Sequence, residues 1–178
     1  MVDTDDAAVV ARCLNGEHNA YEAIVVRYQK GLFNVALRML GSSEDARDAT
    51  QNAFVKAYEH LDSFDSAYPF FSWLYRILKN ECLNILRRRR PSEPVPQDLA
   101  AGDGEDPVEV RERHRAVQQA LLALSMEYRE VVVLRHFTDL SYDEIATTLG
   151  IPAKTVKSRL YTARQQLGEL LVEWHVTR

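Results

Sequence analysis

A run of proline, glycine and acidic residues interrupts the chain near its middle. Four of the six prolines and two of the seven glycines lie between residues 91 and 107. Proline lacks a backbone donor and breaks helices and central strands, so this run excludes both structures. Its acidic, polar composition is typical of an extended, flexible linker. We therefore expect a linker over 91–110 that joins a unit of residues 1–90 to a unit of residues 111–178.

Composition predicts a folded chain without a membrane span. Of the 178 residues, 46% are hydrophobic and 27% are charged, which is too apolar for a disordered chain. No run approaches the roughly 18 consecutive apolar residues of a spanning helix. Residues 1–6 are acidic and lack the apolar core of a secretory signal, so we expect a cytoplasmic protein. Cys13 and Cys82 stand far apart, which argues against a disulfide framework or a cysteine-based zinc site.

The net charge of −4 conceals a separation of charge along the chain. Residues 1–65 carry 6 basic and 11 acidic side chains, whereas 76–90 carry six basic residues and one acid. The range 92–110 has six acids and no base, and 151–166 has four bases and no acid. Two basic patches separated by an acidic linker suit two contacts with one polyanion. On charge alone, solvated helix faces explain the pattern equally well.

Both units are predicted to be helical, so the expected fold class is all-α with two small domains. No run alternates apolar and polar β-formers between hairpin turns. We predict four helices in the first unit, over residues 5–15, 18–40, 43–61 and 69–89. In the second unit the β-branched run Val131–Leu134 resembles a strand, but the pattern of its neighbours favours a short helix over 127–137.

The third predicted helix has a clear start and two different sides. Gly41-Ser42-Ser43 precedes Glu44 and Asp45, which the helix dipole favours in a first turn. Apolar residues recur at spacings of three and four: Ala46, Ala49, Ala53, Phe54, Ala57, Tyr58 and Leu61. The opposite side carries Asp48, Gln51, Asn52 and Lys56.

The fourth predicted helix combines an apolar side with a polar side suited to single-stranded nucleic acid. Pro69 is acceptable as its first residue. The apolar side consists of Phe70, Leu74, Ile77, Leu78 and Ile85, with Glu81 intruding without an evident partner. The polar side consists of Arg76, Asn80, Asn84 and Arg87, with Trp73 at its margin. Rings stack on bases, amides read base edges and guanidinium groups hold phosphates. Core packing of Phe70 and Trp73 is the simpler alternative for the aromatic residues.

The second unit contains the pattern of a helix-turn-helix. Ser141 with Glu144 forms a capping box, and Gly150 is a typical left-handed helix end. Pro152 then opens a second helix. Its inward positions are Val156, Leu160, Ala163 and Leu167, and its outward positions include Lys154, Lys157, Ser158, Tyr161, Thr162 and Gln165. Such an exposed, basic helix suits the DNA major groove, although an αα-hairpin can also be purely structural.

These motifs resemble an alternative sigma factor of bacterial RNA polymerase, of the extracytoplasmic-function (ECF) group. Residues 45–54 and 71–80 resemble that family's region two, and residues 142–146 and 155–160 resemble its region four. The resemblance covers nearly the whole chain outside the linker. Replacement of regions one and three by a short linker is what points to the ECF group.

The resemblance implies promoter recognition in transcription initiation, without cofactor, metal or catalytic residues. Region four would read the minus-thirty-five element as duplex, through Lys154, Thr155, Lys157, Ser158, Arg159, Tyr161, Thr162 and Arg164, and would touch the β flap. Region two would capture and melt the minus-ten strand, through Phe64, Trp73, Arg76, Lys79, Asn80, Asn84, Arg87 and Arg88. Core polymerase would bind through its β′ clamp, at Asp45, Asp48, Gln51 and Asn52. An anti-sigma factor is a further partner that the family implies.

Two positions depart from the family pattern, and two other functions remain open. Thr162 stands where many relatives carry a basic residue. Lys157 replaces a frequent arginine, and lysine cannot make the bidentate fork that arginine makes on guanine. A polymerase-independent regulator would need a dimerisation surface to read a palindrome. An enzyme would need a metal or an activated nucleophile, and the five histidines show no ligand spacing. Asp45 and Asp48 are a possible metal pair, but acids in a first turn are usually dipole partners.

Overall fold

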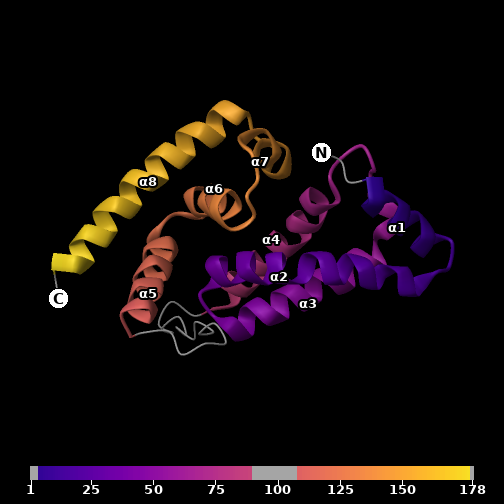
Figure 1. The fold of residues 1–178 in the computed structure, drawn as a ribbon, viewed down its shortest axis with the longest axis horizontal. Coiled ribbons are helices and arrows are strands. Elements are labelled where there is room, and N and C mark those ends of the chain that lie inside the picture. Colours follow the sequence, from indigo (N-terminus) through magenta and orange to yellow (C-terminus); the bar gives the residue numbers. More distant parts are fainter. Residues whose placement is uncertain (1–3, 90–107, 177–178) are drawn as a thin grey trace.

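A computed structural model describes residues 4–89 and 108–176 (Figure 1), and within these ranges the chain forms helices and no strand. The elements are α1 (Thr4–Leu14), η1 (His18–Ala20), α2 (Tyr21–Leu40), α3 (Ser43–Glu59), η2 (Leu61–Ser63), α4 (Phe70–Arg88), α5 (Val108–Ala123), α6 (Met126–Phe137), α7 (Tyr142–Leu149) and α8 (Ala153–Val176). The all-α prediction is confirmed. Most of the predicted linker, residues 90–107, lies outside the described residues, and α5 already begins at Val108.

Helix α3 forms the centre of the first unit because its buried side is built from small residues. Ala46, Ala49, Ala53 and Ala57 are fully buried, which lets α2 and α4 both approach α3 closely. The predicted start is confirmed: Gly41 is left-handed with φ 73°, and the Ser42 hydroxyl accepts a hydrogen bond from the Asp45 amide at 3.2 Å.

The structure corrects two details of the predicted helices. Tyr58 does not belong to the buried stripe, because it is 38% exposed, with its hydroxyl 2.7 Å from Nδ1 of His18. Pro69 is not the first helical residue, because its ψ of 133° is extended and α4 begins at Phe70. The Pro69 carbonyl still accepts the Ser72 amide, so proline caps the helix from just outside it.

Glu81 finds its partner on the neighbouring helix. Its Oε1 lies 2.7 Å from Nζ of Lys56 on α3. The Glu81 side chain is 11% exposed, and the lysine is about half exposed at 49%. A buried carboxylate needs such a cation, since burial without one is strongly unfavourable. Lys56 was predicted on the exposed side of α3, and the ion pair explains how a charged residue fits the apolar side of α4.

The second unit is organised around the short helix α6. Four consecutive residues, Val131–Leu134, are almost completely buried. Helix α6 packs against α8 and α7 on the side of its own unit and against α2 of the first unit. Because four successive residues point to nearly every side of a helix, their burial requires neighbours on several sides of α6. The predicted helix over 127–137 is therefore confirmed, and its β-branched run reflects burial on several sides.

The predicted helix-turn-helix is present in α7 and α8. The Ser141 hydroxyl accepts from the Glu144 amide at 3.3 Å, and the Glu144 carboxylate accepts from the Ser141 amide at 2.8 Å. Gly150 ends α7 in the left-handed conformation, with φ 68°. Helix α8 begins just after Pro152. These local signals fix the turn between the two helices and hence the direction of α8.

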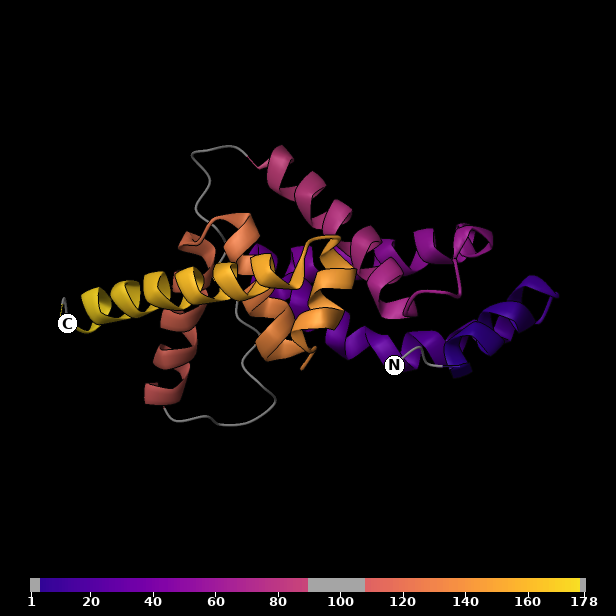
Figure 2. The same ribbon diagram turned by 90° about the horizontal axis from the view of Figure 1, so that it is seen from above.

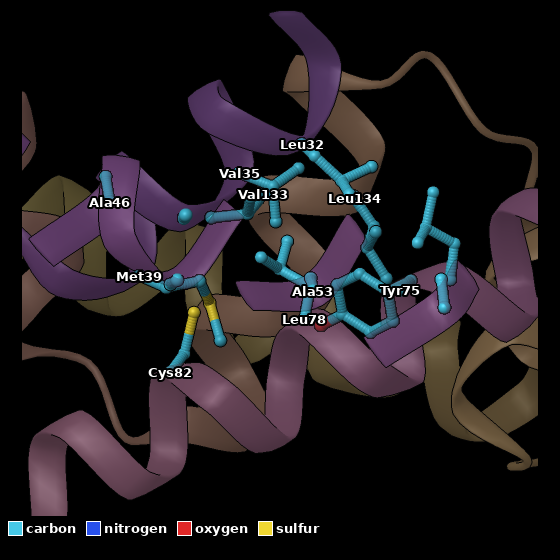
Figure 3. Close-up of a cluster of buried hydrophobic side chains, with 14 of the residues drawn as sticks. Leu32, Val35, Met39, Ala46, Ala53, Tyr75, Leu78, Cys82, Val133 and Leu134 are labelled. Atoms are coloured by element: carbon cyan, nitrogen blue, oxygen red, sulfur yellow. The ribbon is translucent and has the colours of Figure 1, made fainter. Parts of the chain in front are cut away.

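The two units pack against each other and share buried apolar residues. Figures 1 and 2 show α6 and α7 of the second unit lying against α2 and α4 of the first. In Figure 3, Val133 and Leu134 of α6 lie beside Leu32 and Val35 of α2. All four residues are at most 1% exposed. The C-terminal half of α2 is therefore the element on which both units meet.

In the part of the chain that the structure describes, no helix is both long and apolar enough to cross a bilayer.

Replacing Leu32 by alanine should lower the free energy of unfolding by about 2–5 kcal/mol, because it empties a fully buried site at the junction of the units. Urea denaturation monitored by circular dichroism measures the change. Val26→Ala on the same helix is the control, since Val26 is 63% exposed and its truncation should change stability by less than about 0.5 kcal/mol. Equal effects of the two substitutions would contradict the packing described for α2.

The capping box should give α7 a pH-dependent stability. The hydrogen bonds from the Ser141 amide and then the Ser141 hydroxyl lower the pKa of Glu144. The carboxylate's contribution is therefore complete above the pKa of an unfolded glutamate, about 4.3, and is lost as pH falls through the lower pKa of the folded state. Glu144→Gln should cost about 0.3–1 kcal/mol at pH 7 and clearly less near pH 3.

Ser141→Ala is the matched control for this titration. It removes a hydroxyl that does not titrate, so its cost of about 1 kcal/mol should persist at both pH values. Chemical denaturation of the two variants at each pH compares them. A Glu144→Gln cost that stayed constant with pH would show that the charge is irrelevant to the cap.

Candidate nucleic-acid interface

The residues predicted to read duplex DNA gather on the free side of α8. Beneath them Val156, Leu160 and Ala163 are buried where α8 packs on α6 and α7. The exposed members of the predicted set are Lys154, Lys157, Ser158, Tyr161 and Arg164. The half-buried members are Thr155, Arg159 and Thr162. The predicted division of this helix into an inner and an outer side is confirmed.

Neighbouring groups orient part of this basic surface. Arg159 Nη2 lies 2.7 Å from the Glu127 carboxylate of α6. The Lys157 ammonium lies 5.9 Å from the centre of the Tyr142 ring, at the outer limit of a cation–π contact. Burial, followed by the positive Arg164 and Arg135, lowers the pKa of His136, so that this histidine adds no charge near neutral pH. The positive charge of the surface therefore comes from lysine and arginine.

Three aromatic side chains form a cluster at the start of α4. The ring centre of Phe64 lies 5.0 Å from that of Phe70 and 5.6 Å from that of Trp73. Phe70 is 2% exposed and belongs to the core, whereas Phe64 and Trp73 are half-buried. Phe70 therefore packs in the core, as the simpler alternative for this aromatic residue predicted. Phe64 and Trp73 form a partly open rim that holds residues 60–69 against the helix.

The polar side of α4 is only partly free. Of its predicted strand-binding residues, Asn80, Arg87 and Arg88 are exposed and Asn84 is half-buried. Arg76 donates to the Thr147 carbonyl of α7 at 3.3 Å, and Lys79 Nζ lies 2.8 Å from the Glu130 carboxylate of α6. Two of the eight predicted residues therefore contact the other unit of the same chain.

The predicted polymerase-binding residues share the start and the exposed side of α3. Asp48, Gln51 and Asn52 are exposed. Asp45 instead forms an ion pair with Arg89, whose guanidinium also donates to the Leu40 carbonyl at 2.8 Å. No sequence pattern predicted this ion pair. Asp45 and Arg89 are far apart in the sequence and meet only because α3 and α4 pack side by side.

An open groove of about 1140 Å³ runs between α2 and α3. Its apolar lining includes Val25, Phe33, Phe54 and Val55, and Gln51 stands at its edge. Charged residues border it, namely Glu22, Lys30, Arg47 and Glu59. Sequence patterning did not identify this groove, because its lining comes from two helices and the pattern of one helix does not show how the other packs beside it. Its one early signal was Val55, an apolar residue outside the buried stripe and 51% exposed.

The acidic and thiol side chains singled out in the sequence have other partners or are buried in the structure. Within residues 4–89 and 108–176, no three histidine, cysteine or acidic side chains come together in a group that could hold a metal ion. Asp45, half of the possible metal pair, is neutralised by Arg89. Burial, followed by the neighbouring Glu81, raises the pKa of Cys82 to about 12, so its thiol stays protonated and unreactive at neutral pH.

Known proteins share both halves of this arrangement. Residues 24–91 match the family model described as Sigma-70 region 2, and residues 114–167 match Sigma-70, region 4. The solved structure of CnrH in complex with the cytosolic domain of CnrY superimposes with a TM-score of 0.76 at 30% identity, covering 95% of this chain and 98% of that one. The sigma factor RpoE, in complex with the anti-sigma factor NepR from Bartonella quintana, gives 0.68 at 25% identity, covering 85% and 96%.

Curated relatives of the same length agree with these matches. The ECF RNA polymerase sigma factor SigW of Bacillus subtilis is 34% identical over 170 residues, which covers 88% of this chain and 91% of SigW. The ECF RNA polymerase sigma-E factor of Escherichia coli K12 is 34% identical over 176 residues, covering 91% and 92%. The RNA polymerase sigma-H factor of Pseudomonas aeruginosa is 31% identical over 185 residues, covering 96% of each. With both sigma regions present in order on a two-unit helical fold, this chain belongs to the ECF family of RNA polymerase sigma factors.

Proposed function

We propose that this chain directs bacterial RNA polymerase to promoters by binding two DNA elements, in the cytoplasm and without a catalytic step or cofactor of its own. The observation that carries the proposal is the pair of basic helix faces, on α8 and α4, which occur in different units of one chain. A regulator that reads duplex DNA alone needs the first face but not the second. A chain that positions a polymerase needs both.

The minus-thirty-five element is the proposed target of α8. Its exposed lysines, hydroxyls and Tyr161 lie toward the N-terminal half, the part of a recognition helix that enters the major groove. Lys157 is placed to contact a base or phosphate as a point charge. Arg164 lies further along the same helix, where phosphate contacts fix the orientation without reading sequence.

The minus-ten strand is the proposed target of α4 and the segment before it. Phe64 and Trp73 supply partly open rings on which an unstacked base can stack. Asn80 and Asn84 follow at a spacing of four on the same side, so their amides can read base edges. Arg87 and Arg88 continue this line as phosphate contacts. The half-buried state of the aromatic rim suits a base that must leave the duplex stack.

Core polymerase is the proposed occupant of the groove between α2 and α3. The family places the β′ clamp, a helical coiled coil, against the exposed side of α3. An apolar groove bordered by charges of both signs is the shape and chemistry that receives an amphipathic helix. Asp48, Gln51 and Asn52 then flank the contact. An anti-sigma factor is a further proposed partner, since RpoE, a similar chain, is bound by one.

In vitro transcription with purified core polymerase and a promoter library tests the division of labour between the two helices. Lys157→Ala should reduce initiation about tenfold at promoters with particular upstream sequences, because it removes one element-reading contact. Asn80→Ala should mainly reduce strand opening and change the preference at the downstream element. Permanganate footprinting of unpaired thymines separates opening from binding.

Sequence-blind losses of equal size from both substitutions would contradict the two assignments. The free protein should bind duplex promoter DNA poorly, while the holoenzyme binds it well, so gel shifts of each complete the test. A free protein that dimerised on a palindrome and bound with nanomolar affinity at physiological salt would favour the polymerase-independent regulator instead.

A single charge in the groove should disrupt the association with core polymerase. Val55→Asp places a carboxylate on the groove wall at a position that is 51% exposed, so the fold should tolerate it. We expect at least about a tenfold weaker complex, because a desolvated charge would face the apolar side of the partner helix. Val26→Asp is the matched control, with the same change on α2 and 63% exposure, outside the groove lining.

Size-exclusion binding and fluorescence anisotropy with core polymerase measure both variants. Similar affinities for the two variants would exclude the groove as the docking surface. Their thermal melts should coincide with that of the unmodified chain.

A further inference from the structure

The free side of α8 carries two neutral polar side chains among its charged ones. Tyr161 and Gln165 are both exposed, and Tyr161, at 66%, is the most exposed large apolar side chain of those that the structure describes. The two continue a row that Lys157 begins, since residues four apart lie one above the other on one side of a helix. A lysine, a tyrosine and a glutamine therefore follow one another along the surface proposed to enter the major groove.

A hydrogen bond joins the tyrosine to the glutamine. Gln165 Nε2 donates to the Tyr161 hydroxyl oxygen at 3.0 Å. Such a bond between two exposed side chains one turn apart adds little to the stability of a helix. Neither side chain belongs to the core, which Val156, Leu160 and Ala163 fill on the opposite side of α8. The bond therefore orients two groups that face outward, where a ligand can reach them.

The direction of this hydrogen bond decides what the pair offers to a ligand. A tyrosine hydroxyl has one hydrogen to donate, and a glutamine amide has donors on its nitrogen and an acceptor oxygen. Because the Gln165 nitrogen donates to the Tyr161 oxygen, the hydroxyl hydrogen is left for a ligand. The Gln165 carbonyl oxygen, on the other arm of the amide, is left to accept. The pair thus presents one donor beside one acceptor.

Adenine has the complementary pattern in the major groove. Its N7 is an acceptor and its N6 amino group is a donor, whereas guanine shows two acceptors, N7 and O6. The Tyr161 hydroxyl can donate to N7 while the Gln165 oxygen accepts from N6. Guanine would place O6 opposite the Gln165 oxygen, and two acceptors that face each other lose a hydrogen bond. The pair, oriented as it is, therefore favours adenine over guanine.

The charged side chains nearest to this pair do not make the same distinction. Lys157 is a point charge and cannot form the bidentate fork of an arginine. Arg159 is held by the Glu127 carboxylate of α6 at 2.7 Å. Recognition of particular bases by α8 then depends on its uncharged groups. Tyr161 and Gln165 are suited to it because each orients the other.

We propose that Tyr161 and Gln165 together recognise one adenine in the major groove of the minus-thirty-five element, with the hydroxyl donating to N7 and the amide oxygen accepting from N6. The inference rests on the proposed function, because it names a base that α8 reads. Gln165 is both a contact and the positioning residue for the Tyr161 hydroxyl. Four residues advance about 6 Å along a helix, so this adenine is a different base from the one nearest Lys157.

Selection by the holoenzyme tests which base is read. The full chain with core polymerase transcribes a barcoded library in which the minus-thirty-five element is randomised, and sequencing of the transcripts gives the preference at each position. We expect adenine to be favoured over guanine at least about fivefold at one position. Tyr161→Phe and Gln165→Met should each reduce that preference below about twofold. The double variant should lose no more than either single variant, because the two side chains act as a unit.

Gln166→Met is the matched control for this selection. It makes the same change at the next residue, about 100° around α8 and outside the row, so it should leave every preference unchanged. Thermal melts of all the variants should coincide, which shows that they are folded. A loss spread equally over all sequences would indicate a phosphate contact and would overturn the proposal. Unaltered preferences, or a loss at a guanine, would overturn it too.

Base analogues assign the two contacts to atoms. 7-Deazaadenine lacks the N7 acceptor, and purine lacks the N6 amino group. At the selected position, each should lower initiation by the unmodified chain at least about fivefold. Tyr161→Phe should be insensitive to 7-deazaadenine, and Gln165→Met should be insensitive to purine, because the partner atom is already gone. The comparison with the variants corrects for any effect of the analogue on the duplex, and full sensitivity of the variants would overturn the proposal.

A binding selection without polymerase separates this proposal from the proposed function. The full chain is incubated with random duplex DNA at low salt, where phosphate contacts are strong enough to hold a weak complex. An adenine preference that needs both Tyr161 and Gln165 would support the pair even if the chain failed to direct transcription. Conversely, promoter-selective transcription that depends on Lys157 but on neither member of the pair would uphold the proposed function and overturn this inference.

Discussion

Burial of four successive apolar residues of α6, Val131–Leu134, is the constraint on which the rest of the structure depends. Exposing any side of Val131–Leu134 to water would cost roughly 25 cal/mol of free energy for each Å² of apolar surface. Helices α7 and α8 of the same unit cover only part of it, and α8 also keeps a polar face free. Helix α2 supplies further cover, and this brings the second unit onto the first. A four-residue apolar run thus contributes to the packing of the two units on each other.

The same packing changes the meaning of the separated charge. Basic residues on α4 and α8 would together attract a polyanion strongly if all were free. Glu130 and Glu127, both on α6, instead neutralise Lys79 on one side and Arg159 on the other. Helix α6 thus holds the units together through its apolar run, and its two glutamates reduce the positive charge of the basic faces on α4 and α8. An acidic net charge and a DNA-binding function are compatible because the acids are placed where they act on the bases.

Local structure could be predicted from the sequence, and contacts between distant elements could not. The capping box at Ser141, the left-handed Gly150 and the two sides of α8 follow from the chemistry of neighbouring residues, so their prediction succeeded. The partner of Glu81, the pairing of Asp45 with Arg89 and the groove beside Val55 each join helices that are separated in sequence. The apolar periodicity of one helix does not specify which residues of a distant helix it will contact. Tyr58 was misplaced for the same reason, because its surroundings are set by distant residues: its ring meets that of Tyr21 at 5.0 Å and its hydroxyl lies beside His18, which leaves it 38% exposed.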